Sequence, residues 1–166
     1  EGNPVMGSIT SPGNSAFAIT VGALNTWNTV KRDDDTITSY SSRGPTTFEH
    51  LAKPDVAAPG NKIVSLEAPY AHIASMLPSL HVAGAGTNAY MRMSGTSMAA
   101  GVTSGVAALL VQALPGLTAA HAKLLLGGTA SFMPKSGTMA AGAGSIDALA
   151  ARRAASNSLF TLLPAN

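Results

Sequence analysis

The sequence predicts an α/β protein in which short buried strands are followed by helices. Short runs rich in β-branched and small apolar residues lie in the first part of the chain, and three helical stretches lie in the second part. Strands that are followed by helices are typical of a sheet with helices packed on its faces. Functional groups of such proteins gather at the carboxyl ends of the strands, so we look for a site there.

The composition excludes several classes of function. The 166 residues suffice for one domain with a sizeable core, and 46% hydrophobic against 11% charged residues exclude a disordered tail. The net charge is +2, and apart from Arg152-Arg153 the basic residues are scattered, so no nucleic-acid partner is expected. Cysteine is absent, which excludes disulfides, a thiolate nucleophile and cysteine metal ligands.

Strands are expected in four places. The β-branched run Phe17–Leu24 (FAITVGAL) suits a buried strand, and two short strands are expected within Pro54–Gly60 and at Lys62–Leu66. The last strand, AYMRM, ends at Met93. Residues 25–46 are polar and rich in turn residues, and residues 67–90 show no clear period and are expected to form a loop.

Helices are expected from about Thr96 to Leu114, over AAHAKLLLGG after a Thr118 cap, and over ALAARRAA after an Asp147 cap. No charged residue occurs between Met93 and Ala122, so a membrane span has to be considered. Glycine, serine, threonine and proline interrupt this stretch, and a core helix of a protein without membrane contact is predicted instead. The contact of this helix with the sheet is expected to include Gly105, Val102, Val106, Leu109 and Leu110.

The stretch MSGTSMAAG joins the last strand to this helix through the turn Ser94-Gly95. The first helical turn then carries Thr96 and Ser97. A helix N-terminus offers unpaired N–H groups and the positive end of the helix dipole. A hydroxyl there can attack a carbonyl group while a neighbouring N–H stabilises the oxyanion. The residues alone leave two interpretations open: a serine or threonine N-cap, or a nucleophile.

Several segments, in the same order, resemble the subtilisin-like serine proteases. SGTSMAAG resembles the family's nucleophile segment, and GSITSPGNSAFAITVGAL resembles the segment that forms one wall of the primary specificity pocket. SYSSRGPT and KPDVAAPGNKIVS resemble two segments that precede the nucleophile, and LPGLTAAHAKLLLGGTA and GAGSIDALAA resemble the closing helices. The resemblance covers roughly residues 5–155. It implies the C-terminal portion of a doubly wound, mostly parallel sheet, here residues 1–157. Residues 158–166 are an apolar tail to which no role is assigned.

The resemblance also implies roles for individual residues. Ser97 would be the nucleophile, its own N–H would be part of the oxyanion hole, and Thr96 would support the turn. Met98 would lie behind the nucleophile as an exposed thioether that is open to oxidation. Ser11, Pro12 and Gly13 would line the primary pocket. Gly101 and Val102 depart from the family, in which many members carry proline and then histidine at these positions.

The family's general-base histidine and orienting aspartate occur in motifs that this chain does not contain. None of His50, His72, His81 and His121 lies in a His-Gly-Thr context. We therefore expect the histidine, the aspartate and the oxyanion asparagine on a segment that precedes Glu1 and associates non-covalently with this chain. Without that segment the chain is predicted to be inactive, because a serine hydroxyl needs a base to accept its proton.

Three hypotheses about the function compete, and the order of the residues speaks against the third. The first is the serine-bearing part of a secreted subtilisin-like endopeptidase that acts on peptides or proteins, and the second is a non-catalytic remnant that binds peptide or a partner. The third, an α/β-hydrolase esterase, needs an acid and then a histidine after the serine, whereas His121 precedes Asp147. No cofactor is required for the first function. Asp33, Asp34 and Asp35 are interpreted as a solvated turn, with calcium binding as the alternative.

Overall fold

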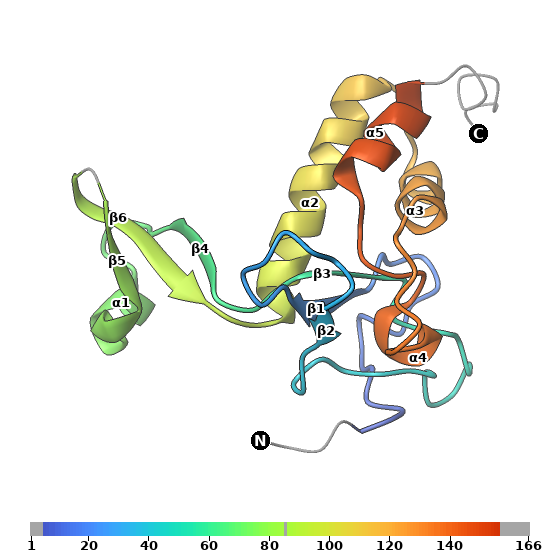
Figure 1. Ribbon diagram of the computed structural model, residues 1–166, viewed down its shortest axis with the longest axis horizontal. Coiled ribbons are helices and arrows are strands. Elements are labelled where there is room, and N and C mark those ends of the chain that lie inside the picture. Colours follow the sequence, from blue (N-terminus) through green and yellow to red (C-terminus); the bar gives the residue numbers. More distant parts are fainter. Residues whose placement is uncertain (1–4, 85, 157–166) are drawn as a thin grey trace.

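The fold consists of a small sheet with helices packed against it and an arm that projects from this body (Figure 1). The computed structural model describes residues 5–84 and 86–156. The predicted domain boundary at residue 157 and the predicted apolar tail at 158–166 lie outside the described residues.

The central sheet has the strand order β2-β1-β3. The strands are β1 (Val21–Asn25), β2 (Thr36–Ile37) and β3 (Val56–Pro59). β1 and β3 are parallel, and β1 and β2 are antiparallel. Most residues of β1 and β3 are small and buried, which lets helices approach the sheet closely. The prediction of a strand from Phe17 is wrong for residues 17–20, which form an irregular segment in which Phe17 is exposed.

The arm contains an antiparallel sheet with the strand order β4-β6-β5, and it projects away from the central sheet (Figure 1). It contains β4 (Ile63–Leu66), α1 (His72–Met76), a 3-10 turn (Pro78–Leu80), β5 (His81–Gly84) and β6 (Gly86–Met93). The strands at Lys62–Leu66 and AYMRM are thus confirmed, but the loop expected at 67–90 is wrong. The sequence does not predict β5 or the first part of β6, because glycine and alanine interrupt the apolar pattern there and much of the arm is exposed.

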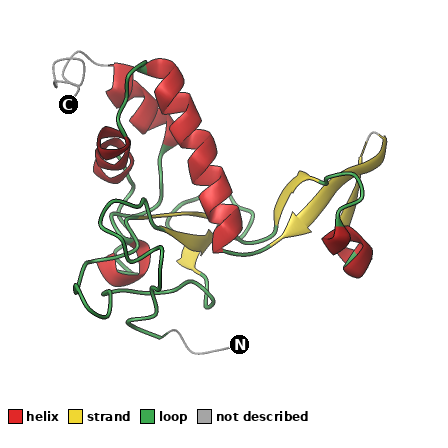
Figure 2. Ribbon diagram, turned by 180° about the vertical axis from the view of Figure 1, so that it is seen from behind, coloured by secondary structure: helices red, strands yellow, loops and turns green. Residues whose placement is uncertain are grey.

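The helices are α2 (Thr96–Ala113), α3 (Ala119–Gly128), α4 (Thr138–Ala141) and α5 (Ala148–Ser156). α2 packs on β1, β3 and α5, and Figure 2 shows α2 rising from the sheet edge. Both predicted caps are confirmed: the Thr118 hydroxyl accepts from the N–H of His121 at 3.3 Å, and the Asp147 carboxylate accepts from the N–H of Ala150 at 2.9 Å. α4 was not predicted, because it is a single turn bounded by two glycines.

α2 buries one face and leaves the other open. Ala99, Thr103, Val106 and Leu110 are buried at the spacing of one helix face, and the three apolar ones belong to the main core. Gly105 and Leu109 are exposed, and apart from the chain neighbours and nearby backbone of α2 no described atom lies within 4 Å of the position that a Gly105 Cβ would occupy. The expectation that these two residues contact the sheet is therefore wrong. Among the described helices, only α2 is long and apolar enough to span a membrane, and here it packs on the sheet.

Candidate active site

The turn between β6 and α2 is fixed to the end of β3. The N–H of Gly95 donates to the carbonyl oxygen of Gly60 at 2.8 Å. The Ser94 hydroxyl accepts from the N–H of Lys62 at 2.9 Å and donates to the Asn61 side-chain oxygen at 3.2 Å. Because three bonds join the two segments, the start of α2 has a defined position at the carboxyl ends of β1 and β3.

Gly60 allows the first turn of α2 to approach the sheet. A Cβ at this position would lie 2.7 Å from the Ala23 Cβ, 2.8 Å from the Gly95 oxygen and 3.1 Å from the Ala99 Cβ. Distances this short are not compatible with a side chain unless the backbone shifts. The absence of a side chain at Gly60 therefore permits the contact between β1, β3 and the first turn of α2.

The N-terminus of α2 is open. Its N-cap residue is Gly95, and no side chain caps the helix. Thr96 and Ser97 are the first and second helical residues, so the interpretation of either hydroxyl as an N-cap is wrong. Within residues 5–84 and 86–156, the N–H groups of Thr96 and Ser97 have no hydrogen-bond partner. Ser97 is exposed, and Met98 is half-buried rather than fully exposed as expected.

This helix end combines a hydroxyl with hydrogen-bond donors. The Ser97 side chain is accessible, and the unpaired N–H groups beside it lie at the positive end of the dipole of an 18-residue helix. Such donors stabilise negative charge that develops on an oxygen atom during attack on a carbonyl. The site can therefore support acyl transfer to Ser97, provided that a base accepts the hydroxyl proton.

A cavity of about 220 Å³ lies beside the start of α2. It is lined by all three residues expected in the specificity pocket, Ser11, Pro12 and Gly13, and it extends to Thr96. The other residues that line it are Ile9, Thr10, Thr20, Val21, Ser41, Ser42 and Pro54. The structure thus brings the predicted pocket wall next to the residue that precedes Ser97.

Sequence reasoning did not identify Ser41 and Ser42 as lining residues. Ser41 is buried, and its hydroxyl accepts from the N–H of Ala23 at 3.0 Å. Serines in a polar turn carry no sequence signal that separates this role from solvent exposure. Only the quoted segment SYSSRGPT pointed to this part of the chain.

The four histidines are distributed over the molecule. His50 is exposed in a loop and His72 begins α1, whereas His121 lies in the first turn of α3. In the arm, His81 Nδ1 lies 2.9 Å from the Glu67 carboxylate. In the part of the chain that the structure describes, no histidine lines the cavity or forms a hydrogen bond with Ser97.

The three aspartates at 33–35 differ from one another. The Asp34 carboxylate accepts from the Thr29 hydroxyl at 2.9 Å. Asp35 is buried and its Oδ1 has no hydrogen-bond partner among the described residues, so the interpretation as a solvated turn is wrong for Asp35. Burial raises the pKa of Asp35, as do the charges of Asp34 and Asp33, and Arg32 lowers it. No metal-binding group of three or more histidine or acidic side chains occurs among the described residues, and calcium binding stays a prediction.

Comparison with known proteins identifies the family. The subtilase family (peptidase S8) matches residues 2–158. The serine protease AprX from Bacillus subtilis (strain 168) is 47% identical over 119 residues, which is 72% of this chain and 26% of that protein. Mycosin-3 from Mycobacterium tuberculosis is 38% identical over 97 residues, 58% of this chain and 20% of that protein. The chain thus spans about a quarter or less of the length of these relatives.

Solved structures show the same fold. Fervidolysin from Fervidobacterium pennivorans, described as a keratinolytic enzyme related to subtilisin, superposes with a TM-score of 0.65 at 27% identity. The match covers 86% of this chain and 20% of fervidolysin. The Clostridium perfringens CspB protease is 24% identical and superposes with a TM-score of 0.69. That match covers 92% of this chain and 30% of the CspB protease. The chain therefore belongs to the subtilase family, and its α/β fold is a part of the fold of the subtilisin-like serine proteases.

Proposed function

We propose that the chain is the nucleophile-bearing part of a subtilisin-like serine endopeptidase that hydrolyses peptide bonds through an acyl-enzyme on Ser97. One observation carries the proposal: the cavity lined by Ser11, Pro12 and Gly13 reaches Thr96, directly before an exposed serine at an open helix N-terminus. A peptide side chain in this cavity brings its own carbonyl group close to the start of α2.

The reaction follows from this arrangement. Ser97 Oγ attacks the carbonyl carbon of the scissile bond, and its proton passes to a base. The carbonyl oxygen becomes negatively charged and accepts from the N–H of Ser97, at the positive helix end. The protonated base then gives its proton to the leaving amine, which yields the acyl-enzyme. Water activated by the same base hydrolyses the ester and regenerates the Ser97 hydroxyl.

The base, its orienting aspartate and an oxyanion asparagine belong, in this proposal, to a segment outside residues 1–166. Two observations support this assignment: the described histidines lie away from Ser97, and the relatives are several times longer than this chain. The open face of α2, with Gly101 and Gly105, is a surface on which such a segment can pack. As the family resemblance implies, we also propose that the protein is secreted.

Replacement of the nucleophile tests the proposal in the longer protease that contains this chain. Ser97→Ala should lower kcat by about 10⁶, as loss of the serine does in subtilisin, while peptide binding is kept. Ser156→Ala is the matched control, because Ser156 is exposed on α5, not on the open face of α2, and its hydroxyl likewise donates to a main-chain oxygen, that of Arg152. Its turnover should stay within about twofold of the unmodified protein, since exposed surface changes have small effects.

Two outcomes would contradict the proposal. Turnover that survives Ser97→Ala would mean that another residue is the nucleophile. Peptide binding without any hydrolysis by the unmodified protein would favour the alternative, a non-catalytic subtilisin-like protein that binds peptide or a partner.

A further inference from the structure

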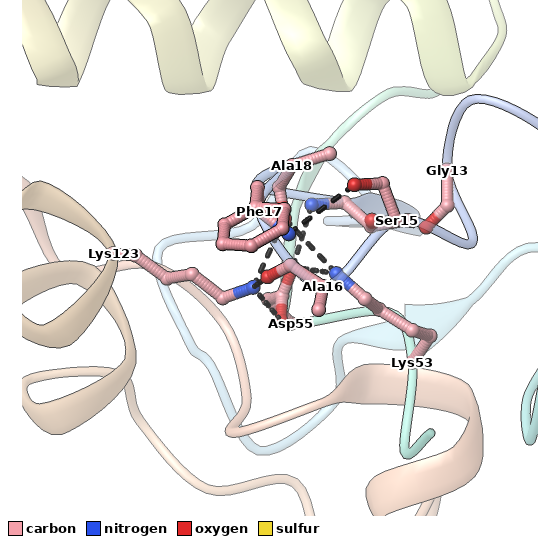
Figure 3. A network of polar contacts seen from close by, with 9 residues as sticks. Gly13, Ser15, Ala16, Phe17, Ala18, Lys53, Asp55 and Lys123 are labelled. Carbon is pink, nitrogen blue, oxygen red and sulfur yellow. Dashed lines mark hydrogen bonds and ion pairs between the residues drawn. The ribbon is translucent and has the colours of Figure 1, made fainter. Parts of the chain in front are cut away.

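The segment before β1 is held by two lysines and one carboxylate from distant parts of the chain (Figure 3). Lys53 Nζ donates to the Ala18 oxygen at 2.9 Å and to Asp55 Oδ2 at 2.7 Å. Lys123 Nζ donates to the oxygens of Ala16 and Ala18 at 2.8 and 3.0 Å, and it lies 3.0 Å from Asp55 Oδ1. We call Lys53, Asp55 and Lys123 the lysine clamp.

The lysine clamp is buried at Lys53 and half-buried at Asp55 and Lys123. The exposed fraction of the side chain is 2% for Lys53, 15% for Asp55 and 27% for Lys123. The pKa of Lys53 is lowered, mainly by burial and also by the neighbouring Lys123 ammonium group, while the hydrogen bond and charge of Asp55 oppose this shift. Buried charges persist only when they are paired, and here each ammonium group binds both the carboxylate and main-chain carbonyl groups. The clamp therefore fixes the backbone of residues 16–18, which forms no strand.

A chain of contacts connects the clamp to the cavity beside α2. Asp55 Oδ2 also accepts from the N–H of Thr20 at 2.7 Å, and the Thr20 hydroxyl donates to the Gly13 oxygen at 2.6 Å. Both Thr20 and Gly13 line the cavity, and so does Pro54 between Lys53 and Asp55. None of the three clamp side chains lines it, so they can act on a bound peptide only through the position of these neighbours.

We propose that the lysine clamp positions the wall formed by Ser11, Pro12 and Gly13 and thereby sets which peptide side chain the cavity accepts. This inference rests on the proposed function, since it assigns the cavity to the substrate. Lys123 is the informative member, because from α3 it reaches residues 16–18, which follow the wall and lie over 100 residues away in sequence. Removing its charge leaves the Lys53–Asp55 pair intact, whereas removing Asp55 would leave two ammonium groups without their carboxylate.

The first test measures positioning without reference to activity. In the longer protease that contains this chain, Lys123→Met should speed amide hydrogen exchange in residues 13–20 by about tenfold or more, because local opening governs exchange. Lys123→Arg should restore protection, at least in part, since arginine keeps the charge and several donors. Lys135→Met is the control: Lys135 binds only the exposed Asp33 oxygen and does not line this cavity.

The second test measures specificity. Peptides that differ only in the size of the side chain before the scissile bond are compared by kcat/KM. Lys123→Met should change the ratio between a large and a small side chain by about tenfold, the range in which pocket contacts discriminate. The fraction of Ser97 that reacts with a fluorophosphonate should stay unchanged. If Lys123→Met does not fold, Lys123→Gln, which also removes the charge at a position that does not line the cavity, should shift the same ratio.

The outcomes separate this inference from the proposed function. Unchanged exchange in residues 13–20, or an unchanged substrate ratio in both variants, overturns the role of the lysine clamp while hydrolysis by Ser97 stands. If the unmodified protein hydrolyses no peptide, the proposed function fails and the specificity role fails with it. The exchange measurement still decides whether the clamp positions the wall.

Discussion

The N–H of Gly95 donates to the carbonyl oxygen of Gly60 at 2.8 Å, and this bond ties the turn before Ser97 to the end of β3. The Tyr40 hydroxyl donates to the same Gly60 oxygen at 3.0 Å. Gly60 thus joins the sheet, the first turn of α2 and the segment after β2. Its oxygen accepts two bonds while its α-carbon lies against Ala23 and Ala99.

Gly60→Ala should displace the start of α2. The added methyl group would lie 2.7 Å from the Ala23 Cβ and 2.8 Å from the Gly95 oxygen, and overpacking of this kind costs about 1–3 kcal/mol. The melting temperature and kcat/KM should both fall. Gly128→Ala is the control, because nothing lies within 4 Å of that position, and an equal loss in both variants would contradict the account.

Asp35→Asn should stabilise the protein near neutral pH. Burial raises the pKa of Asp35 and its Oδ1 has no partner, so the folded state binds a proton more tightly than the unfolded state. Stability is therefore lost as the pH rises from the ordinary value of 3.8 through the raised pKa. We expect a gain of about 1 kcal/mol at neutral pH, which shrinks as the medium becomes acidic.

Denaturant unfolding at several pH values measures this difference. Glu49→Gln, at an exposed position, is the control and should show no comparable pH-dependent gain. A destabilised Asp35→Asn variant near neutral pH would mean that the Asp35 carboxylate has a stabilising partner.

Oxidation of Met98 should lower turnover. Met98 follows Ser97 at the open end of α2, and a sulfoxide oxygen there would crowd the developing oxyanion. We expect peroxide to lower kcat by roughly tenfold or more, with a smaller change in KM. Met98→Leu should protect the enzyme, since leucine is close in volume and cannot be oxidised. Full activity in a sample whose Met98 is oxidised, as seen by mass spectrometry, would contradict this placement.

Gly105→Leu should destabilise the complete protease that we propose, although Gly105 is exposed in the described residues. If another segment packs on the open face of α2, a leucine there overpacks that contact by about 1–3 kcal/mol. Gly128→Leu, at an open position of α3, should cost nothing comparable in a thermal unfolding experiment. Equal melting temperatures for the two variants would mean that the open face of α2 stays uncovered.

Local signals made the helices predictable from the sequence. Thr118 and Asp147 each cap the helix that follows them, and a cap depends only on residues within one turn. The two helical turns that were missed, α1 and α4, are short and show no apolar period. The burial of Gly105 was wrongly predicted because an apolar sequence does not reveal which helix face meets the sheet.

The candidate site was only partly predictable. Ser97, Thr96 and the wall residues Ser11, Pro12 and Gly13 came from the resemblance, and whether they act as it implies stays a prediction. The lysine clamp gave no local signal, because its contacts join residues that lie 35 and 105 positions apart. The burial of Asp35 could not be predicted, because nothing in the sequence distinguishes this aspartate from the two before it.

The central claim is that Ser97 is a nucleophile whose base comes from outside this chain. The most direct measurement is fluorophosphonate labelling of residues 1–166 with and without the preceding segment of the same gene product, with the labelled residue located by mass spectrometry. The account predicts a label on Ser97, together with peptide turnover, only when that segment is present, because a serine hydroxyl without a base is a poor nucleophile. Labelling and turnover by residues 1–166 alone would contradict it, since the chain's own histidines would then supply the base.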